Sequence, residues 1–131
     1  MMPAEIIERA SNGNPQAKTL CWAYLNFCWT VDALYDRDEE CSSERVACAV
    51  ANFIAELTAN PFYLANAAPL LAVMQLGVSA WADSERAEMK HAKPFLKAQY
   101  HDFLWLVARL TGGWDHMRNL QTSAREYEMA N

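Results

Sequence analysis

Prolines preceded by asparagines constrain this chain more than any other feature of its sequence. Proline is favoured at the first position of a helix, and an asparagine just before it can cap the free N–H groups. Asn14-Pro15 and Asn60-Pro61 have this form, and Pro3 and Pro94 fit the same role. Pro69 either begins a new helix or kinks the one that starts at Pro61. The prolines therefore predict a succession of helices.

The composition agrees with this prediction. The 131 residues are 53% hydrophobic and 21% charged, unlike a disordered chain, and they include 22 alanines but 4 glycines. Thr111-Gly112-Gly113 predicts a helix stop and a tight reversal. We expect one all-α domain over 1–131, a bundle of five or six helices. The expected helices lie near 3–11, 15–37, 43–59, 61–87 with a break around 67–69, 94–111 and 114–128.

Charge and hydropathy exclude two classes of partner. A net charge of −5 and a pI near 5.1 argue against binding to nucleic acid, which needs a basic surface. The uncharged run 57–82 is long enough to cross a bilayer, but it contains prolines, asparagines and a glutamine. We therefore expect a buried central helix and no membrane span. The first residues lack a basic region followed by an apolar run, so we expect a cytoplasmic protein.

Apolar spacing predicts which side chains form the core. In helix 43–59 one face carries Val46, Val50, Phe53, Ile54 and Leu57. In helix 94–111, Tyr100, Phe103 and Val107 share the inward face, and the opposite, outward face carries Lys97, His101, Trp105 and Ala108. The cysteines lack zinc-site spacing, so we expect small core residues at Cys21, Cys28, Cys41 and Cys48.

Two aspartates interrupt the apolar side of helix 15–37. At about 100° per residue, Asp32 and Asp36 fall in the same arc as Leu25 and Trp29. Buried carboxylates one turn apart require a shared cation, a shared proton or basic partners. A divalent ion such as Mg²⁺ or Mn²⁺, held by Asp32, Asp36 and Asp38, would meet that need.

Protein side chains offer an alternative to a metal. Lys18 could pair with the two aspartates, and so could the basic cluster formed by Arg86, Lys90, His91, Lys93 and Lys97. The candidate ligand-binding residues near this site are Trp29, Lys90, Lys93 and Asp102. A calcium-binding EF-hand loop is excluded, because Cys41 stands where its sharp turn needs glycine and Ala47 where a bidentate glutamate is needed.

Residues 29–39, Trp-Thr-Val-Asp-Ala-Leu-Tyr-Asp-Arg-Asp-Glu, resemble the first aspartate-rich helix of terpenoid and prenyl diphosphate synthases. In that family such aspartates hold magnesium ions that bind a substrate diphosphate in an aromatic-lined, all-α cavity. The resemblance assigns that role to Asp32 and Asp36, with Asp38 as a third ligand. The chain departs from the family at Ala33, where a second adjacent aspartate is usual, and it is much shorter. The resemblance therefore implies a smaller metal or phosphate site.

Two functions remain open at this point. One is a cation-dependent enzyme or a ligand-binding bundle that uses Asp32 and Asp36. The other is a non-enzymatic helical protein that associates with itself or with another protein and whose acidic helix end is salt-bridged. We also expect a homodimer, because a bundle of this length has limited interior for its apolar side chains and Trp105 is expected to point outward.

Overall fold

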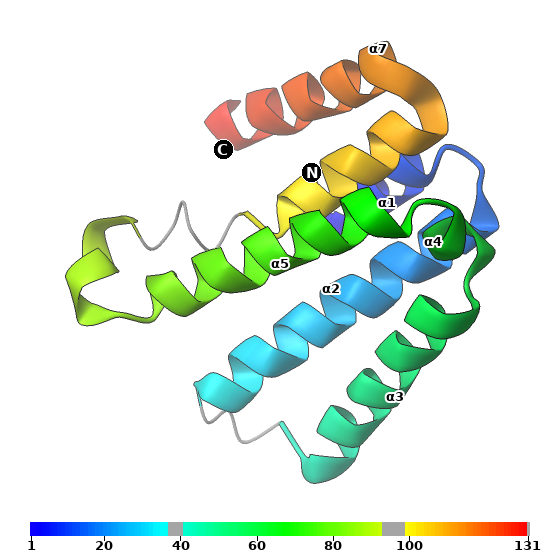
Figure 1. The fold of residues 1–131 in the computed structure, drawn as a ribbon. Coiled ribbons are helices and arrows are strands. Elements are labelled where there is room, and N and C mark those ends of the chain that lie inside the picture. The colour runs from blue at the N-terminus through cyan, green and yellow to red at the C-terminus, as the bar shows by residue number, and fades with distance from the viewer. Residues whose placement is uncertain (37–40, 93–98, 131) are drawn as a thin grey trace.

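The computed structural model describes residues 1–36, 41–92 and 99–130. Within them the chain forms six α-helices, one 3-10 helix and no strand, which confirms the predicted all-α fold (Figure 1). The elements are α1 (Pro3–Ser11), α2 (Pro15–Tyr35), α3 (Ser43–Ala59), α4 (Pro61–Ala65), α5 (Ala67–Ser84), η1 (Ala87–Ala92) and α7 (His101–Ala130).

Asparagine caps begin α2 and α4, as the sequence predicts. The Asn14 side chain accepts hydrogen bonds from the backbone N–H groups of Gln16 and Ala17, both at 3.0 Å. The Asn60 side chain accepts one from Tyr63 at 3.1 Å, and its amide donates to the carbonyl of Gln16 at 2.9 Å. Asn60 therefore ties the junction of α3 and α4 to the start of α2.

Several helix boundaries differ from the prediction. The break in the long apolar run lies at Asn66, and Pro69 is the third residue of α5. Because Pro is tolerated in the first turn, α5 continues through it without a kink. Beyond Ser84 the chain forms η1 instead of continuing as an α-helix.

The helix predicted over 15–37 ends at Tyr35. In the helix predicted over 94–111, Gln99 and Tyr100 form a turn before α7, which begins at His101. Residues 37 and 94 themselves lie outside the described residues.

A reversal divides α7 into two halves. Gly113 has φ 89° and ψ −178°, a conformation open essentially to glycine alone, which confirms the predicted stop and turn. Figure 1 shows the second half folding back from this point. The Thr111 hydroxyl donates to the carbonyl of Ala10 at 2.7 Å, and His116 Nε2 lies 2.7 Å from the carbonyl oxygen of Arg9. These contacts fix the turn against the end of α1.

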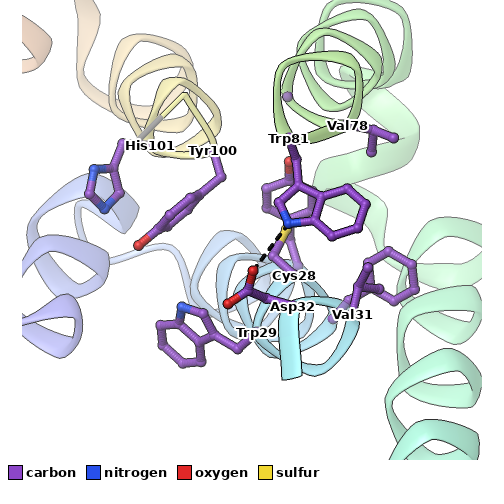
Figure 2. Close-up of a pocket in the computed structure, with 11 residues that line it drawn as sticks. Cys28, Trp29, Val31, Asp32, Val78, Trp81, Tyr100 and His101 are labelled. Atoms are coloured by element: carbon purple, nitrogen blue, oxygen red, sulfur yellow. Dashed lines mark hydrogen bonds between the residues drawn. The ribbon is translucent and has the colours of Figure 1, made fainter. Parts of the chain in front are cut away.

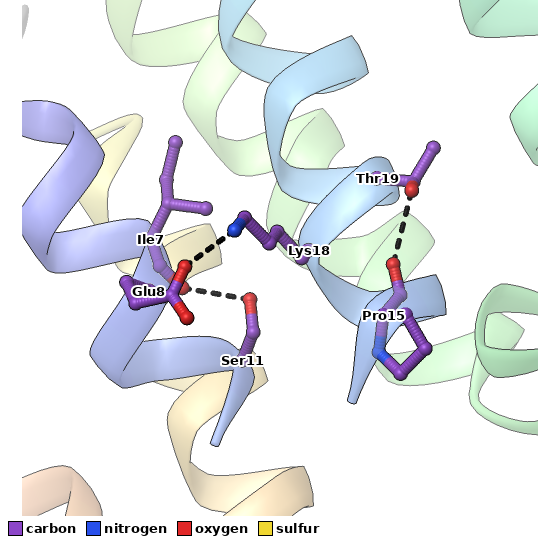
Figure 3. Close-up of polar contacts among 6 residues, drawn as sticks. All are labelled: Ile7, Glu8, Ser11, Pro15, Lys18 and Thr19. Carbon is purple, nitrogen blue, oxygen red and sulfur yellow. Dashed lines mark hydrogen bonds and ion pairs between the residues drawn. The ribbon is translucent and has the colours of Figure 1, made fainter. Parts of the chain in front are cut away.

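The core lies where α1, α2 and α7 meet, and α4 and α5 add to it. Its fully buried large side chains are Ile7, Leu20, Tyr24, Leu25, Leu70, Phe103, Leu104, Val107 and Leu120. At the junction of α1 and α2, Lys18 pairs with Glu8 and the Ser11 hydroxyl donates to the carbonyl of Ile7 at 2.7 Å (Figure 3).

The prediction that the uncharged run forms a buried central helix is wrong. One face of α5 is buried, but Leu71, Leu76 and Val78 are 47%, 66% and 55% exposed. In the described part of the chain, α5 packs on α7, η1 and α4, and these contacts leave the other faces of α5 exposed. In the part of the chain that the structure describes, none of the helices is long and apolar enough to cross a membrane.

The predicted core faces of two other helices also need correction. In α3, Val50 and Ile54 are exposed because α3 lies at the edge of the bundle, against α2 and α4. In α7, Trp105 is half-buried and Ala108 is fully buried, because α1, α2 and α5 all pack against this helix. The expected outward face of α7 is therefore wrong at these two positions and at His101, which is also partly buried.

The cysteines do not share one environment. Cys21 is buried, as predicted for a small core residue, and Cys28 and Cys41 are partly buried. Cys48 is exposed, so the core prediction is wrong at that position. All four have free thiols.

Candidate functional site

A pocket of about 520 Å³ lies between α2, α5 and the start of α7 (Figure 2). It exists because α5 packs closely on α7 and α4 but not on α2, which leaves space between α2 and α5. Most of its lining is aromatic or aliphatic. The lining residues are Tyr24, Phe27, Cys28, Trp29, Val31 and Asp32 of α2, Gly77, Val78 and Trp81 of α5, and Tyr100 and His101.

Asp32 supplies a carboxylate to this apolar wall. The Trp81 indole N–H donates to Asp32 Oδ1 at 3.2 Å, across the pocket from α5 to α2. The Trp81 ring also meets Tyr35 edge to face, with ring centroids 5.5 Å apart. These two contacts hold the carboxylate in position at the pocket wall.

Aromatic pairs hold the walls in place. Trp29 contacts Trp22 edge to face at 6.5 Å, and Tyr100 packs on His101 with ring centroids 4.3 Å apart. In Figure 2 the side chains of Trp29, Trp81 and Tyr100 come from three parts of the chain and surround the Asp32 carboxylate. Paired rings of this kind lose little freedom when a ligand binds.

Gly77 leaves room for a buried hydroxyl at the pocket wall. A Cβ atom at this position would lie 3.1 Å from the Tyr24 hydroxyl oxygen, closer than such contacts normally are. Tyr24 is buried and its ring stacks near Phe103, at 4.3 Å between centroids, so it has little room to move away. Because residue 77 is a glycine, α5 leaves space for the Tyr24 hydroxyl.

Burial shifts the pKa of four groups of the wall, Tyr24, Cys28, Tyr100 and His101, in the direction that favours their uncharged forms. It raises the pKa of Cys28 to about 11, although hydrogen bonding with Tyr24 partly offsets this effect. Burial also raises the pKa of Tyr24 and of Tyr100, and it lowers the pKa of His101. A protonated thiol is a poor nucleophile. The raised pKa therefore argues against Cys28 as a nucleophile.

The predicted site residues do not all meet here. Asp32 and Trp29 line the pocket. Asp36 is exposed because α2 ends at Tyr35, so the expectation that both aspartates face the interior is met by Asp32 alone. Lys90 is exposed in η1, Asp102 is exposed in α7, and neither lines the pocket. Asp38 and Lys93 lie outside the described residues.

The predicted partners of the aspartates are also partly corrected. Lys18 lies near the opposite end of α2 and pairs with Glu8, so its predicted pairing with Asp32 and Asp36 is wrong. Arg86, from the predicted basic cluster, lies 3.6 Å from a carboxylate oxygen of Glu88. Among the described residues no three His, Cys, Asp or Glu side chains come close enough to hold a metal ion. A Mg²⁺ or Mn²⁺ site at Asp32 stays a prediction.

Sequence reasoning identified Trp29 and Asp32 and missed the other nine lining residues, which include Gly77, Trp81, Tyr100 and His101. Two of them carry a signal that the sequence contains. A lone glycine inside an apolar helix marks a close approach, and Gly77 lies one turn before Trp81, on the same face. His101 has no such signal, since helical spacing places it opposite the core face.

Comparison with known proteins finds no matching family model, no similar curated protein and no similar solved structure.

Proposed function

We propose that this chain is a binding protein for small, largely apolar molecules, which occupy the pocket between α2 and α5. The observation that carries the proposal is an aromatic-lined cavity of about 520 Å³ with few polar groups. Pockets for small organic molecules range from about 300 to 1,000 Å³ and combine apolar walls with a few placed polar groups. Asp32, Tyr100 and His101 supply those polar groups.

The proposal is tested by filling the mouth of the pocket. Val78 lines the pocket but is 55% exposed, so a phenylalanine there can occupy the entrance without disturbing the core. We expect Val78→Phe to weaken the binding of 3-tert-butylphenol at least about ten-fold, as measured by calorimetry and by shifts of the Trp81 indole N–H resonance. A loss of this size corresponds to about 1.4 kcal/mol.

Leu71→Phe is the matched control. Leu71 is exposed on the same side of α5, two turns before Val78, and it does not line the pocket. This variant should bind the phenol as the wild type does. If the wild-type protein shows no saturable binding, or if both variants bind equally well, the pocket is not a ligand site and the proposal fails.

Self-association is a second candidate function. It is supported by exposed apolar side chains on two helices, Leu71 and Leu76 of α5 and Val50 and Ile54 of α3. Isolated exposed leucines are common on monomers, but contiguous apolar surface favours an interface. A dimer with two-fold symmetry is the form that such a surface most simply gives.

A further inference from the structure

The Tyr24 hydroxyl is a polar group that packing holds at the pocket wall. Tyr24 lines the pocket and is 2% exposed. Its ring packs on Phe103 and Phe53, with centroid distances of 4.3 and 6.0 Å. Close packing leaves a core side chain little freedom to move, so the hydroxyl stays beside α5.

Gly77 leaves space next to this hydroxyl. A Cβ atom at residue 77 would lie 3.1 Å from the Tyr24 hydroxyl oxygen, so a larger residue would crowd that oxygen. Gly77 and Tyr24 both line the cavity, and the glycine places no side chain between them. A small ligand group can therefore approach the oxygen from the cavity.

The hydroxyl also has hydrogen-bonding capacity to offer a ligand. Among the described side chains, its hydrogen-bond partner is the Cys28 thiol, which lies at the same wall (Figure 2). A thiol is a weak donor and a weak acceptor, whereas a hydroxyl has one donor and two acceptor sites. A ligand hydroxyl suits this position, because it can both donate to Tyr24 and accept from it.

We propose that the pocket binds apolar alcohols and phenols, whose hydroxyl group forms a hydrogen bond with the Tyr24 hydroxyl beside Gly77. The apolar body of the ligand lies against the aromatic and aliphatic walls of the cavity. This inference rests on the proposed ligand-binding function and adds the functional group of the ligand and the residue that recognises it.

Two uncharged probes of the same shape test the role of the ligand hydroxyl. In 3-tert-butyltoluene a methyl group replaces the hydroxyl of 3-tert-butylphenol, and both probes are neutral at pH 7. The toluene gains more from leaving water, because it has no polar group to desolvate. The informative quantity is therefore the change in the ratio of the two affinities when Tyr24 is altered, measured by calorimetry.

Tyr24→Phe removes the hydroxyl and keeps the ring against Phe53 and Phe103. We expect this variant to bind the phenol about five-fold more weakly than the wild type and the toluene unchanged, since a net hydrogen bond contributes about 1 kcal/mol. Tyr63→Phe is the matched control, because Tyr63 is also buried but does not line the pocket. It should leave both affinities as they are.

The outcomes separate the two proposals. If Tyr24→Phe keeps the phenol affinity, or weakens both probes equally, the inference about Tyr24 is wrong and the proposed function stands. If neither probe binds the wild-type protein, both proposals fail.

A measurement on the wild-type protein makes the test independent of how well a variant folds. We expect the phenol to shift the Tyr24 Cζ resonance more than the toluene does, because a hydrogen bond at the hydroxyl changes the electron density at the carbon that bears it. Equal shifts with the two probes, or a phenol-specific shift at Tyr100 instead of Tyr24, would overturn the assignment.

Discussion

His101 shows that packing can bury a side chain that helical spacing places on the outward face. Helical spacing places it on the outward face of its helix, yet it lines the pocket and packs on Tyr100 and near Trp105, with a ring distance of 6.0 Å to the latter. Burial lowers its pKa from the ordinary value near 6.5, and the charges of Glu128 and Asp102 oppose that shift. The folded protein therefore favours the neutral imidazole.

This shift predicts a pH dependence of stability. Below about pH 6.5 the unfolded chain binds a proton at His101, whereas the folded chain does so at a lower pH. The free energy of unfolding should therefore fall as the pH drops from about 6.5 through the lowered pKa. His101→Gln should remove this part of the fall, as measured by urea unfolding at several pH values.

His91→Gln is the control for that measurement. His91 is exposed in η1 and does not line the pocket. The variant should keep the wild-type dependence on pH. An unchanged pH dependence in His101→Gln would contradict the burial argument.

At the scale of the helices, the junction at Asn60 has the clearest energetic consequence. Its side chain is 5% exposed, caps α4 through Tyr63 and donates to Gln16 of α2 and to Glu56 of α3, at 2.9 and 2.6 Å. Replacement by alanine removes the cap and leaves the carbonyl of Gln16 without this donor. We expect Asn60→Ala to lower the free energy of unfolding by about 1–3 kcal/mol, as measured by urea unfolding.

Asn66 is the matched comparison for Asn60, because it holds the corresponding position before the next helix, α5. It precedes α5, but its side chain makes no capping hydrogen bond and donates to the carbonyl of Phe62 at 2.9 Å. Asn66→Ala should therefore cost less, about 0.5–1.5 kcal/mol. A larger loss for Asn66→Ala than for Asn60→Ala would show that the cap at Asn60 contributes little.

Local signals in the sequence predict the helices well, because capping and proline geometry act within a few residues. Asn14-Pro15, Asn60-Pro61 and the glycine turn at 112–113 define α2, α4 and the reversal in α7. The packing is less predictable, because a helical wheel shows an apolar face but not what covers it. Val50 and Ile54 belong to such a face in α3, and no neighbouring helix covers them.

The sequence predicts only the part of the candidate site that lies on α2, because the rest depends on how the helices pack. Asp32 could be identified because a carboxylate among apolar residues of its own helix is a local signal. Trp81 and His101 come from other parts of the chain, and their approach to Asp32 depends on how α5 and α7 pack. No spacing within α2 contains that information.

The whole molecule exposes a large surface for its mass. The chain exposes 7963 Å², whereas a compact monomer of 14.8 kDa exposes about 7,000 Å². The difference of roughly 1,000 Å² means that the chain exposes more surface than a typical compact monomer of its mass. Part of this extra surface is the exposed apolar side of α5, where Leu76 is 66% exposed.

We therefore expect a dimer at concentrations of about 10 μM or above, measured by sedimentation or light scattering. Leu76→Glu should shift it toward the monomer, because a buried, unpaired carboxylate disfavours an apolar interface. Gln75→Glu is the control, since it adds the same charge to an exposed neighbour on α5 and removes no apolar surface. A wild-type protein that remains monomeric at about 100 μM would exclude the dimer. A dimer that Leu76→Glu leaves intact would place the interface away from this side of α5, which directs attention to Val50 and Ile54 of α3.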